Sequence, residues 1–412
     1  VTAYEFQCLH GMGETLYDTV VGNSGPGRAR CRIYAPVGRH ETLLPYLVRR
    51  LLENGANSSF VNRLVDENVK IETLVANPLT TVLSNGGVPH LAIPLPTQLY
   101  GPERRNSTGL DLSSDLELEP LTAELERLRH QRWQAEPRLA AGEGGGDAYP
   151  VRNPAHWDEI VGTVRDACPS DLEHALSAAA AYAETWHQTA PTERGRLLRQ
   201  AADLLESHRP ELISLCIREA GKTWPNAVAE IREAVDFCRY YALQAERLAT
   251  TDRPPPGVVA CISPWNFPLA IFMGQITAAL AAGSPVLAKP AEQTPLTAAQ
   301  AVHWLHQAGI PRAALQLLPG PGETIGATLI RDTRVRGVLF TGSLEVAQLI
   351  NRALAARAAA LPDTRLIAET GGQNAMIVDS SALAEQVVQD VIASGFDSAG
   401  QRCSALRVLC LQ

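Results

Sequence analysis

The sequence lacks several features that define whole classes of protein. No uninterrupted apolar run approaches the roughly 20 residues that a membrane-spanning helix needs. The eight cysteines are scattered, with no Cys-x-x-Cys pair and no histidine cluster at metal-ligand spacing, so we expect neither a disulfide framework nor a metal site. Aromatic residues make up only 5% of the chain, which favours helix-rich layers over an all-β sandwich. The net charge of −8 argues against a nucleic-acid-binding surface.

The chain also has no methionine at its first position. It begins with Val1, runs directly into an apolar strand pattern and ends at Gln412 inside another such pattern, Leu406–Cys410. We therefore expect it to be an internal piece of a longer protein, in which no signal peptide can be sought. Its 412 residues, 45% of them hydrophobic and 19% charged, are enough for two or three domains with buried cores.

The first region, about residues 1–100, alternates strands with helical periodicity. Two short strands, Tyr4–Leu9 and Arg32–Ala35, are ended by Gly11 with Gly13 and by Pro36-Val37-Gly38. A strand–helix repeat predicts parallel βα units, and two units cannot close a barrel of eight strands. We therefore interpret this region as the tail of a βα barrel.

The second region, about 101–150, is predicted to be a linker with one amphipathic helix over Leu118–Trp133 and a flexible Gly-rich stretch.

The third region, from about 151, opens with predicted helices over Asp171–His187, Thr192–His208 and Asn226–Leu248. Short apolar strands separated by turns follow, and they predict a doubly wound α/β sheet for a nucleotide. The predicted strands are Val258–Ser263, Val286–Ala288, Leu315–Leu317, Gly337–Phe340, Leu366–Glu369 and Ala375–Val378.

Three segments of the third region carry groups suited to nucleophilic catalysis. Cys403 has small or polar neighbours, so its thiol could lie in an accessible turn, although a structural cysteine is the commoner case. Asn266 lies in a loop bracketed by Pro264 and Pro268, which could aim its amide at an oxyanion or simply pack Trp and Phe. Glu369 ends an apolar strand before two glycines, where a half-buried carboxylate would serve as a base or, alternatively, cap a helix or form a salt bridge.

Two further segments suit a dinucleotide. Thr341-Gly342-Ser343 follows a strand and precedes a helix over Glu345–Ala359, so its amides could meet a pyrophosphate. Lys289 and Glu292 follow another strand and could grip ribose hydroxyls, although such a pair is more often a surface ion pair. The segment Gly320–Gly326 does not match the dinucleotide fingerprint, because its spacing is off by one and Pro321 intrudes.

Together these segments, in this order, resemble the aldehyde dehydrogenase superfamily. The resemblance covers about 150–412 and implies a nucleophile, Cys403, an oxyanion hole formed by Asn266 and the Cys403 backbone N–H, and a base, Glu369, for the deacylating water. It implies that NAD rather than NADP binds, mildly favoured by Glu292. The implied NAD-binding residues are Ser263, Trp265, Lys289, Glu292, Gly322, Gly342 and Ser343. Phe267 and Ser404 are candidate residues of the aldehyde pocket, and Arg402 is either an attractor for an anionic substrate or structural.

In the first region, Tyr46, Arg49 and Arg50 share one face of a helix predicted over Leu43–Glu53, and Tyr34 lies near the end of the preceding strand. Such a set suits a carboxylate clamp, although a solvated basic helix face would look the same. The segments Glu5–Gln7, His10–Gly13, Arg32–Gly38 and Tyr46–Asn54 resemble the end of the proline dehydrogenase barrel. That resemblance implies that Tyr34, Tyr46, Arg49 and Arg50 bind the proline carboxylate beside FAD.

Because it carries both resemblances in this order, the chain is similar to the bifunctional proline utilisation A family of bacteria. That family oxidises proline to pyrroline-5-carboxylate with FAD, and then the glutamate semialdehyde formed by hydrolysis to glutamate with NAD. The implied domains are 1–100, the C-terminal part of the barrel; 101–150, the linker; 151–379, the NAD domain; and 380–412, the start of the catalytic domain. The resemblance further implies a cytoplasmic homo-oligomer, peripheral at the inner membrane, with a quinone acceptor and no nucleic acid bound by this piece. The alternatives are a monofunctional NAD-dependent dehydrogenase for another aldehyde and a non-catalytic scaffold.

Overall fold

A computed structural model describes residues 5–10, 17–18, 30–55, 63, 66, 68–84, 86–88, 93–248, 254–357 and 363–412. These residues divide into two units, Val1–Leu91 and Ala92–Gln412, and each is described here by itself. Gly11 and Gly13, which we expected to end the first strand, lie outside the described residues.

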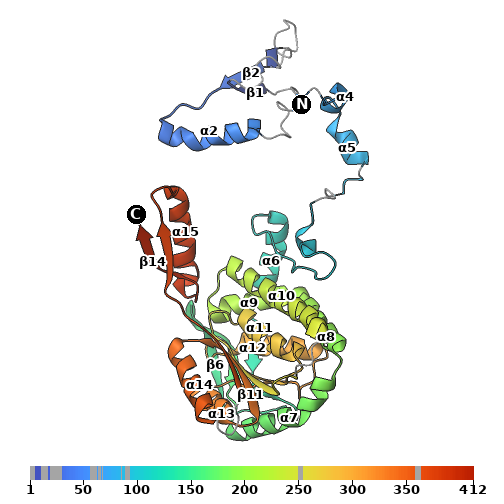
Figure 1. Cartoon of the computed structure of the whole chain (residues 1–412), viewed down its shortest axis with the longest axis vertical. Helices are drawn as coiled ribbons and strands as arrows, with labels where there is room; N and C mark the ends of the chain where they lie inside the picture. The colour runs from blue at the N-terminus through green and yellow to red at the C-terminus, as the bar shows by residue number, and fades with distance from the viewer. Residues whose placement is uncertain are drawn as a thin grey trace. The chain divides into compact units, whose positions relative to one another are not determined.

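The first unit contains the predicted parallel pair of strands. β1 (Glu5–Leu9) pairs with β2 (Arg30–Tyr34), and the last residues of the two strands, Leu9 and Tyr34, are register partners. Helix α2 (His40–Gly55) follows, and then the short helices α4 (Ile71–Leu74) and α5 (Pro78–Ser84) (Figure 1). The two parallel strands and the helix after the second strand are confirmed, whereas the helix predicted between the strands falls mainly on residues outside the described ones.

The second unit begins with the segment that we predicted to be a linker with one helix. It contains a 3-10 turn η1 (Pro96–Gln98), α6 (Asp115–Leu128) and three short strands, β3 (Trp133–Ala135), β4 (Arg138–Leu139) and β5 (Gly142–Glu143). The predicted helix end at Trp133 is wrong, because Trp133 lies in a strand. Leu121, Leu128 and Leu139 are buried, so this segment packs into the unit, and β4 and β5 extend its main sheet.

A hairpin then precedes the first predicted helix of the third region. β6 (Ala148–Asn153) and β7 (His156–Arg165) are antiparallel, and β3 adds to β7 in parallel to make a three-stranded sheet. The predicted helices are present as α7 (Pro169–Gln188), α8 (Pro191–Ser207) and α10 (Trp224–Leu248). Between α8 and α10 lies a helix that we did not predict, α9 (Arg209–Ala220), which ends at Gly221 in the left-handed conformation with φ 66°.

The main sheet has seven strands in the order β12-β11-β8-β9-β10-β4-β5. Five of them are parallel: β8 (Val258–Ile262), β9 (Val286–Lys289), β10 (Leu315–Leu317), β11 (Val335–Gly342) and β12 (Arg365–Thr370). The chain runs outward from β8 to β10 and then returns to place β11 on the other side of β8. In an open α/β sheet, the crevice at such a reversal is where ligands bind.

Helices cover both faces of this sheet, as a doubly wound fold requires (Figure 1). Val259 and Cys261 of β8 face a core that includes residues of α8, α9, α10, α11 (Ala270–Ala281) and α12 (Pro295–Gln307). Val258, Ala260 and Ile262 face the opposite core, with α7, α13 (Ala327–Arg331) and α14 (Leu344–Arg357). All five residues of β8 are buried, because side chains alternate between two covered faces.

The C-terminal residues form a separate layer. β13 (Asn374–Val378) does not join the nucleotide sheet, as we had expected of Ala375–Val378, but pairs in parallel with β14 (Leu406–Leu411). Between these strands lie α15 (Ala384–Phe396) and a 3-10 turn η3 (Asp397–Gly400). The partner strand lies about 30 residues farther along the chain, so the local apolar pattern of 375–378 could not reveal which sheet it joins.

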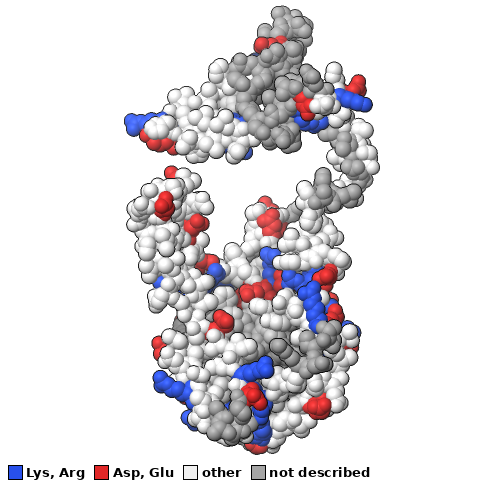
Figure 2. Space-filling view, viewed as in Figure 1, with Lys and Arg blue, Asp and Glu red and all other residues white. Residues whose placement is uncertain are grey.

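The surface of the second unit carries both signs of charge. Figure 2 shows Lys and Arg interspersed with Asp and Glu over the visible face of this unit. Among the described residues, no helix combines the length and the hydropathy that crossing a bilayer would need.

Candidate active site

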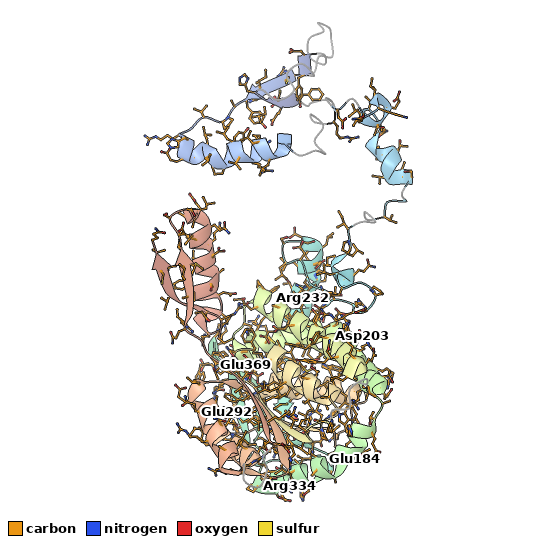
Figure 3. The ribbon with its side chains drawn as sticks, viewed as in Figure 1. Glu184, Asp203, Arg232, Glu292, Arg334 and Glu369 are labelled. Carbon is orange, nitrogen blue, oxygen red and sulfur yellow. The ribbon has the colours of Figure 1, made fainter. Side chains whose placement is uncertain are left out.

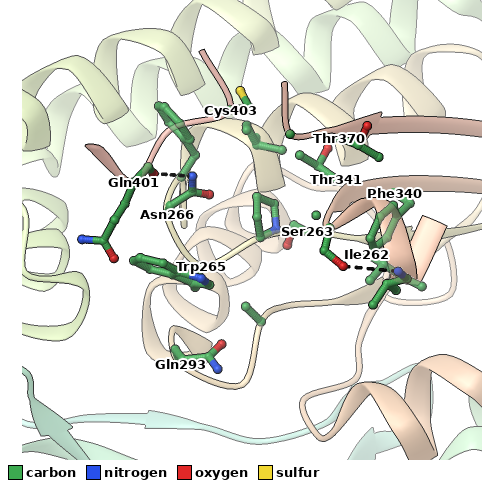
Figure 4. Close-up of a pocket in the computed structure, with 18 of the residues that line it drawn as sticks. Ile262, Ser263, Trp265, Asn266, Gln293, Phe340, Thr341, Thr370, Gln401 and Cys403 are labelled. Atoms are coloured by element: carbon green, nitrogen blue, oxygen red, sulfur yellow. Dashed lines mark hydrogen bonds between the residues drawn. The ribbon is translucent and has the colours of Figure 1, made fainter. Parts of the chain in front are cut away.

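A cavity of about 780 Å³ opens at the carboxyl ends of β8, β9 and β11 (Figure 4). Most of its lining comes from five stretches of chain, and Ile271, Gly322, Glu323, Val346 and Arg407 complete it. The five stretches are 262–267 after β8, 289–293 after β9, 340–343 at the end of β11, 370–371 after β12, and 399–403 before β14. The cavity therefore lies at the chain reversal of the sheet and brings together most of the segments that the sequence singled out.

Cys403 lies in the turn before β14 and lines this cavity (Figure 4). It is exposed, whereas Cys216, Cys238 and Cys261 are fully buried. Burial raises the pKa of each of these three thiols, so they remain protonated and unreactive at neutral pH. Cys403 thus has the accessibility that a nucleophile needs.

The turn that presents Cys403 has an unusual backbone. Ser398 and Ala399 have φ of 54° and 55°, and Gly400 has φ of 68°. Left-handed conformations cost energy for residues other than glycine, and they persist only where surrounding contacts hold them. A Cβ on Gly400 would lie 2.8 Å from the carbonyl oxygen of Gly395, so this position requires glycine.

Asn266 lies on the opposite wall, in the loop after β8, and contacts the Cys403 turn. Its amide nitrogen Nδ2 donates to the carbonyl oxygen of Gln401 at 2.7 Å (Figure 4). The same nitrogen carries a second N–H that this bond does not use. In the described part of the chain, the backbone N–H of Cys403 donates to no acceptor. Two donors beside the thiol are therefore available to an oxyanion.

Glu369 differs from the expectation of a half-buried base. It is exposed, and it does not line the cavity, although the next two residues, Thr370 and Gly371, do. The reason is its place on β12, the outermost strand of the sheet on this side, where it is the register partner of Thr341. Figure 3 shows Glu369 where the sheet gives way to the C-terminal strands.

Lys289 and Glu292 form a polar cluster at the end of β9. The Lys289 ammonium, whose side chain is 4% exposed, lies 2.7 Å from Oε1 of Glu292, and the same oxygen accepts the backbone N–H of Gly322 at 2.6 Å. Burial opposes ionisation of Glu292, but the hydrogen bonds from Lys289 and Gly322 outweigh it and lower the pKa of Glu292. Three residues that we predicted to bind a cofactor thus contact one another.

The other predicted cofactor residues, Ser263, Trp265, Gly342 and Ser343, line the same cavity. Ser343 Oγ accepts the backbone N–H of Val346 at 3.2 Å and so caps the first turn of α14. A second, more apolar cavity of about 300 Å³ shares Ile262, Gly322, Glu323 and Val346 with the first. Its remaining lining residues are Gly326, Ala327, Ile330, Arg331, Leu349, Ile350 and Ala353.

The two candidate residues of the aldehyde pocket behave differently. Phe267 lines the main cavity, and the guanidinium carbon of Arg402 lies 5.9 Å from the centre of its ring. Ser404 is exposed and is not among the lining residues. Arg402 lines the cavity but is also tied by an ion pair to Asp397 at 3.0 Å.

Asn374 is a residue of the site that the sequence did not reveal. Its Nδ2 donates to the carbonyl oxygens of Cys403 at 2.7 Å and of Ala405 at 3.0 Å. The available signal was a polar side chain at the start of an apolar strand, directly after the Gly371-Gly372-Gln373 turn. That signal alone does not identify a partner about 30 residues away.

In the first unit, the predicted carboxylate-binding residues lie on β2 and α2. Tyr34 is the last residue of β2, and its carbonyl oxygen accepts the N–H of His10 at 2.9 Å. On α2, the guanidinium carbon of Arg50 lies 5.2 Å from the ring centre of Tyr46, as expected for residues four apart on one helix face. Arg49 is on the same helix and is exposed.

Two family models match different parts of the chain, and relatives that match nearly the whole chain are known. The aldehyde dehydrogenase family model matches residues 141–412, and the proline dehydrogenase model matches residues 1–63. The bifunctional protein PutA of Escherichia coli is 58% identical over 99% of this chain, which covers 32% of that protein. The chain thus spans about a third of the length of the curated PutA relatives that it matches.

The solved structures that resemble this chain include the same two kinds of protein, proline utilization A and an aldehyde dehydrogenase. A crystal structure of a proline utilization A mutant from Bradyrhizobium japonicum is 45% identical, with a TM-score of 0.82, over 99% of this chain and 39% of that one. A 1-pyrroline-5-carboxylate dehydrogenase from Thermus with bound NAD is 34% identical, with a TM-score of 0.70, over 75% of this chain and 63% of that one.

Proposed function

Since the chain belongs to the aldehyde dehydrogenase family, we propose that residues 141–412 carry the NAD site and the nucleophile of an enzyme that oxidises glutamate semialdehyde to glutamate. One observation carries this proposal: the accessible thiol of Cys403 lines the same cavity as Asn266 and the Lys289–Glu292 cluster. A nucleophile, an oxyanion donor and a dinucleotide cleft in one cavity are the parts that acyl transfer coupled to hydride transfer needs.

We further propose that the protein is bifunctional. The first 63 residues match the proline dehydrogenase family, and the relatives called bifunctional protein PutA resemble the chain over nearly its whole length. In this proposal, Tyr34, Tyr46, Arg49 and Arg50 bind the carboxylate of proline, which is oxidised with FAD to pyrroline-5-carboxylate. The domains would be barrel tail, linker, NAD domain and the start of the catalytic domain, with the linker packed against the NAD domain.

The residues of the second unit fit NAD. A buried ammonium at Lys289 and an ionised Glu292 suit ribose hydroxyls, because together they offer a donor and an acceptor. The apolar cavity that adjoins the main one suits an adenine ring. The amides around Ser343, at the start of α14, suit a pyrophosphate. Bound NAD would accept the hydride of the aldehyde.

In the proposed mechanism, the Cys403 thiolate attacks the aldehyde carbon and a carbon–sulfur bond forms. The carbonyl oxygen becomes an oxyanion, which the Asn266 amide and the Cys403 N–H stabilise. Collapse of the oxyanion would release a hydride, for which NAD held beside Lys289 and Glu292 would be the acceptor, and a thioester would remain on Cys403. Glu369 does not itself line the cavity, but the next residues, Thr370 and Gly371, do, so we assign it the proton of the attacking water. The resulting hydroxide attacks the thioester, and the carbon–sulfur bond breaks to release the acid and the thiol.

The partners and location follow from the resemblance of the sequence to the proline utilisation A family. We propose a cytoplasmic homo-oligomer that meets the inner membrane peripherally and passes the electrons of proline to a quinone.

The test uses full-length protein supplied with pyrroline-5-carboxylate and NAD, and compares wild type with Cys403→Ala and Cys410→Ala. Both cysteines are exposed, so Cys410 is a matched control. We expect NADH and glutamate from wild type and Cys410→Ala but none from Cys403→Ala. NADH from another aldehyde but not from pyrroline-5-carboxylate would instead indicate a monofunctional dehydrogenase of different specificity. Glutamate formed from proline with a quinone or dye acceptor tests the bifunctional proposal.

A further inference from the structure

Three polar side chains at the start of α10 reach both walls of the candidate site. Lys222 precedes the helix, and Asn226 and Glu230 are one turn apart on it. All three are buried, with residue exposures of 8%, 9% and 2%. Buried polar groups are retained only where they are paired, so their partners show what they hold in place.

Glu230 and Lys222 hold the wall that carries Asn266. Oε2 of Glu230 accepts the backbone N–H groups of Leu269, at 3.2 Å, and of Ala270, at 2.9 Å, which start α11 directly after the Asn266 loop. Oε1 of Glu230 lies 3.1 Å from the Lys222 ammonium. The same ammonium lies 4.6 Å from the ring centre of Phe267, the neighbour of Asn266. These contacts therefore attach the loop that carries Asn266 to α10.

Asn226 holds the wall that carries Cys403. Its Nδ2 donates to Oδ1 of Asp397 at 2.9 Å, and its Oδ1 accepts from Nη2 of Arg402 at 2.6 Å. Arg402 and Asp397 are themselves paired at 3.0 Å, which closes a triangle. Asp397 and Arg402 are the residues that bracket the left-handed stretch 398–400 and Gln401, immediately before Cys403.

A backbone strained over Ser398 and Ala399 needs external contacts to persist, and this triangle supplies them. The side chain of Asn226 uses both ends of its amide, so its orientation is determined by its two partners. Since Asn226 and Glu230 lie on one helix, the distance between the two walls follows from the rise of α10 rather than from loops.

We propose that Asn226 is a positioning residue, which through Asp397 and Arg402 sets the Cys403 turn at a defined place relative to the Asn266 amide. This inference rests on the proposed aldehyde oxidation. It assigns to α10 a role as the common support of nucleophile and oxyanion donor, which the sequence pattern of an amphipathic helix did not indicate.

The test is a swap of the hydrogen-bonding pair in the full-length protein. Asn226→Asp turns the donor into a carboxylate that faces the carboxylate of Asp397, whereas Asn226→Asp with Asp397→Asn restores a donor and an acceptor with the original total charge. Arg232→Gln, at an exposed position of the same helix, is the matched control. The readouts are kcat and KM for NAD with pyrroline-5-carboxylate, the rate at which iodoacetamide alkylates Cys403, and the melting temperature.

We expect Asn226→Asp to lower kcat by about 10- to 100-fold and to slow alkylation of Cys403, since misplacing a reacting group by about 1 Å costs this much. KM for NAD should change by less than about twofold, and the double variant should regain most of the lost kcat, as expected for coupled residues. Wild-type kcat in Asn226→Asp, or a double variant no better than the single one at equal melting temperature, would overturn the inference. A wild-type enzyme without NAD-dependent turnover would instead overturn the proposed function itself.

Discussion

The side-chain amide of Asn374 donates to the carbonyl oxygen of Cys403 at 2.7 Å, across the gap between β13 and the turn before β14. The same nitrogen donates to Ala405 at 3.0 Å, so one side chain holds the backbone on both sides of Ser404. The Asn266 amide also donates to the carbonyl oxygen of Gln401, so the turn that carries Cys403 is held by two asparagine side chains.

We predict that Asn374→Ala lowers kcat by about 10- to 100-fold, because freeing the Cys403 backbone loosens both the thiol and the N–H donor of the oxyanion hole. NAD affinity should not change, since Asn374 lies outside the residues of the dinucleotide cleft. Steady-state kinetics and NAD titration measure the two effects. Gln373→Ala, at the exposed neighbouring position, is the control and should behave as wild type. If kcat were the same in both variants, Asn374 would have no role in positioning Cys403.

For Lys289→Met, we predict a Kd for NAD that rises by about 10- to 100-fold, because a hydrogen bond to a charged group contributes about 1.5–3 kcal/mol. The change also deprives Glu292 of the partner that lowers its pKa. Fluorescence titration with NAD measures the affinity, and kcat at saturating NAD should fall much less. A variant with normal affinity and depressed kcat would show that Lys289 acts elsewhere.

Two glycines near Cys403 should respond oppositely to alanine. At Gly400, φ is 68° and a Cβ would lie 2.8 Å from a carbonyl oxygen, so Gly400→Ala should destabilise the turn by about 1–3 kcal/mol and reduce kcat. At Gly395, inside α15, the nearest atom to a Cβ is 4.0 Å away, and Gly395→Ala should be neutral or slightly stabilising. Urea unfolding and kcat of the two variants check this. The account of the turn fails if both behave alike.

His306 should contribute to acid sensitivity. Burial, together with the neighbouring Arg138, Arg312 and His303, lowers the pKa of His306 to about 4, although Nε2 donates to the Leu315 carbonyl. The unfolded chain then binds the proton more tightly, so the stability that neutral His306 contributes is present above about pH 6.5 and is lost as pH falls towards 4. The loss cannot exceed about 1.4 kcal/mol per pH unit.

Urea unfolding of wild type and His306→Gln at several pH values between 6.5 and 4 measures this contribution. The variant should lose less stability over this range than wild type, whereas His174→Gln, at an exposed position, should follow wild type. Parallel curves for wild type and His306→Gln would contradict the prediction.

Much of the nucleotide sheet could be predicted because its strands are short, apolar and followed by turns. The strands at 258–263, 286–288, 315–317 and 337–340 are present within one or two residues of the predicted bounds. Their carboxyl ends meet at one edge, so placing Asn266, Lys289 and Ser343 after strand ends was enough to bring them together in one cavity.

What could not be predicted depends on contacts distant in sequence. The bounds of helix α11 could not be predicted, because it is apolar on nearly all sides and buried, and so shows no amphipathic period. The exposure of Glu369 follows from its position on an edge strand, which a local pattern does not reveal. The partners of Asn374 and Asn226 lie about 30 and 170 residues away, so their roles emerge only from the fold.

The most direct test of the central claim is to trap the acyl group on Cys403. In Glu369→Gln, pyrroline-5-carboxylate and NAD should give a burst of about one NADH per site and then stop, because the thioester forms but water is not activated. Mass spectrometry of the digested protein should then find the acyl group on the peptide that contains Cys403, with none in Glu369→Gln combined with Cys403→Ala. An acyl group on any other residue, or full turnover without Cys403, would contradict the account.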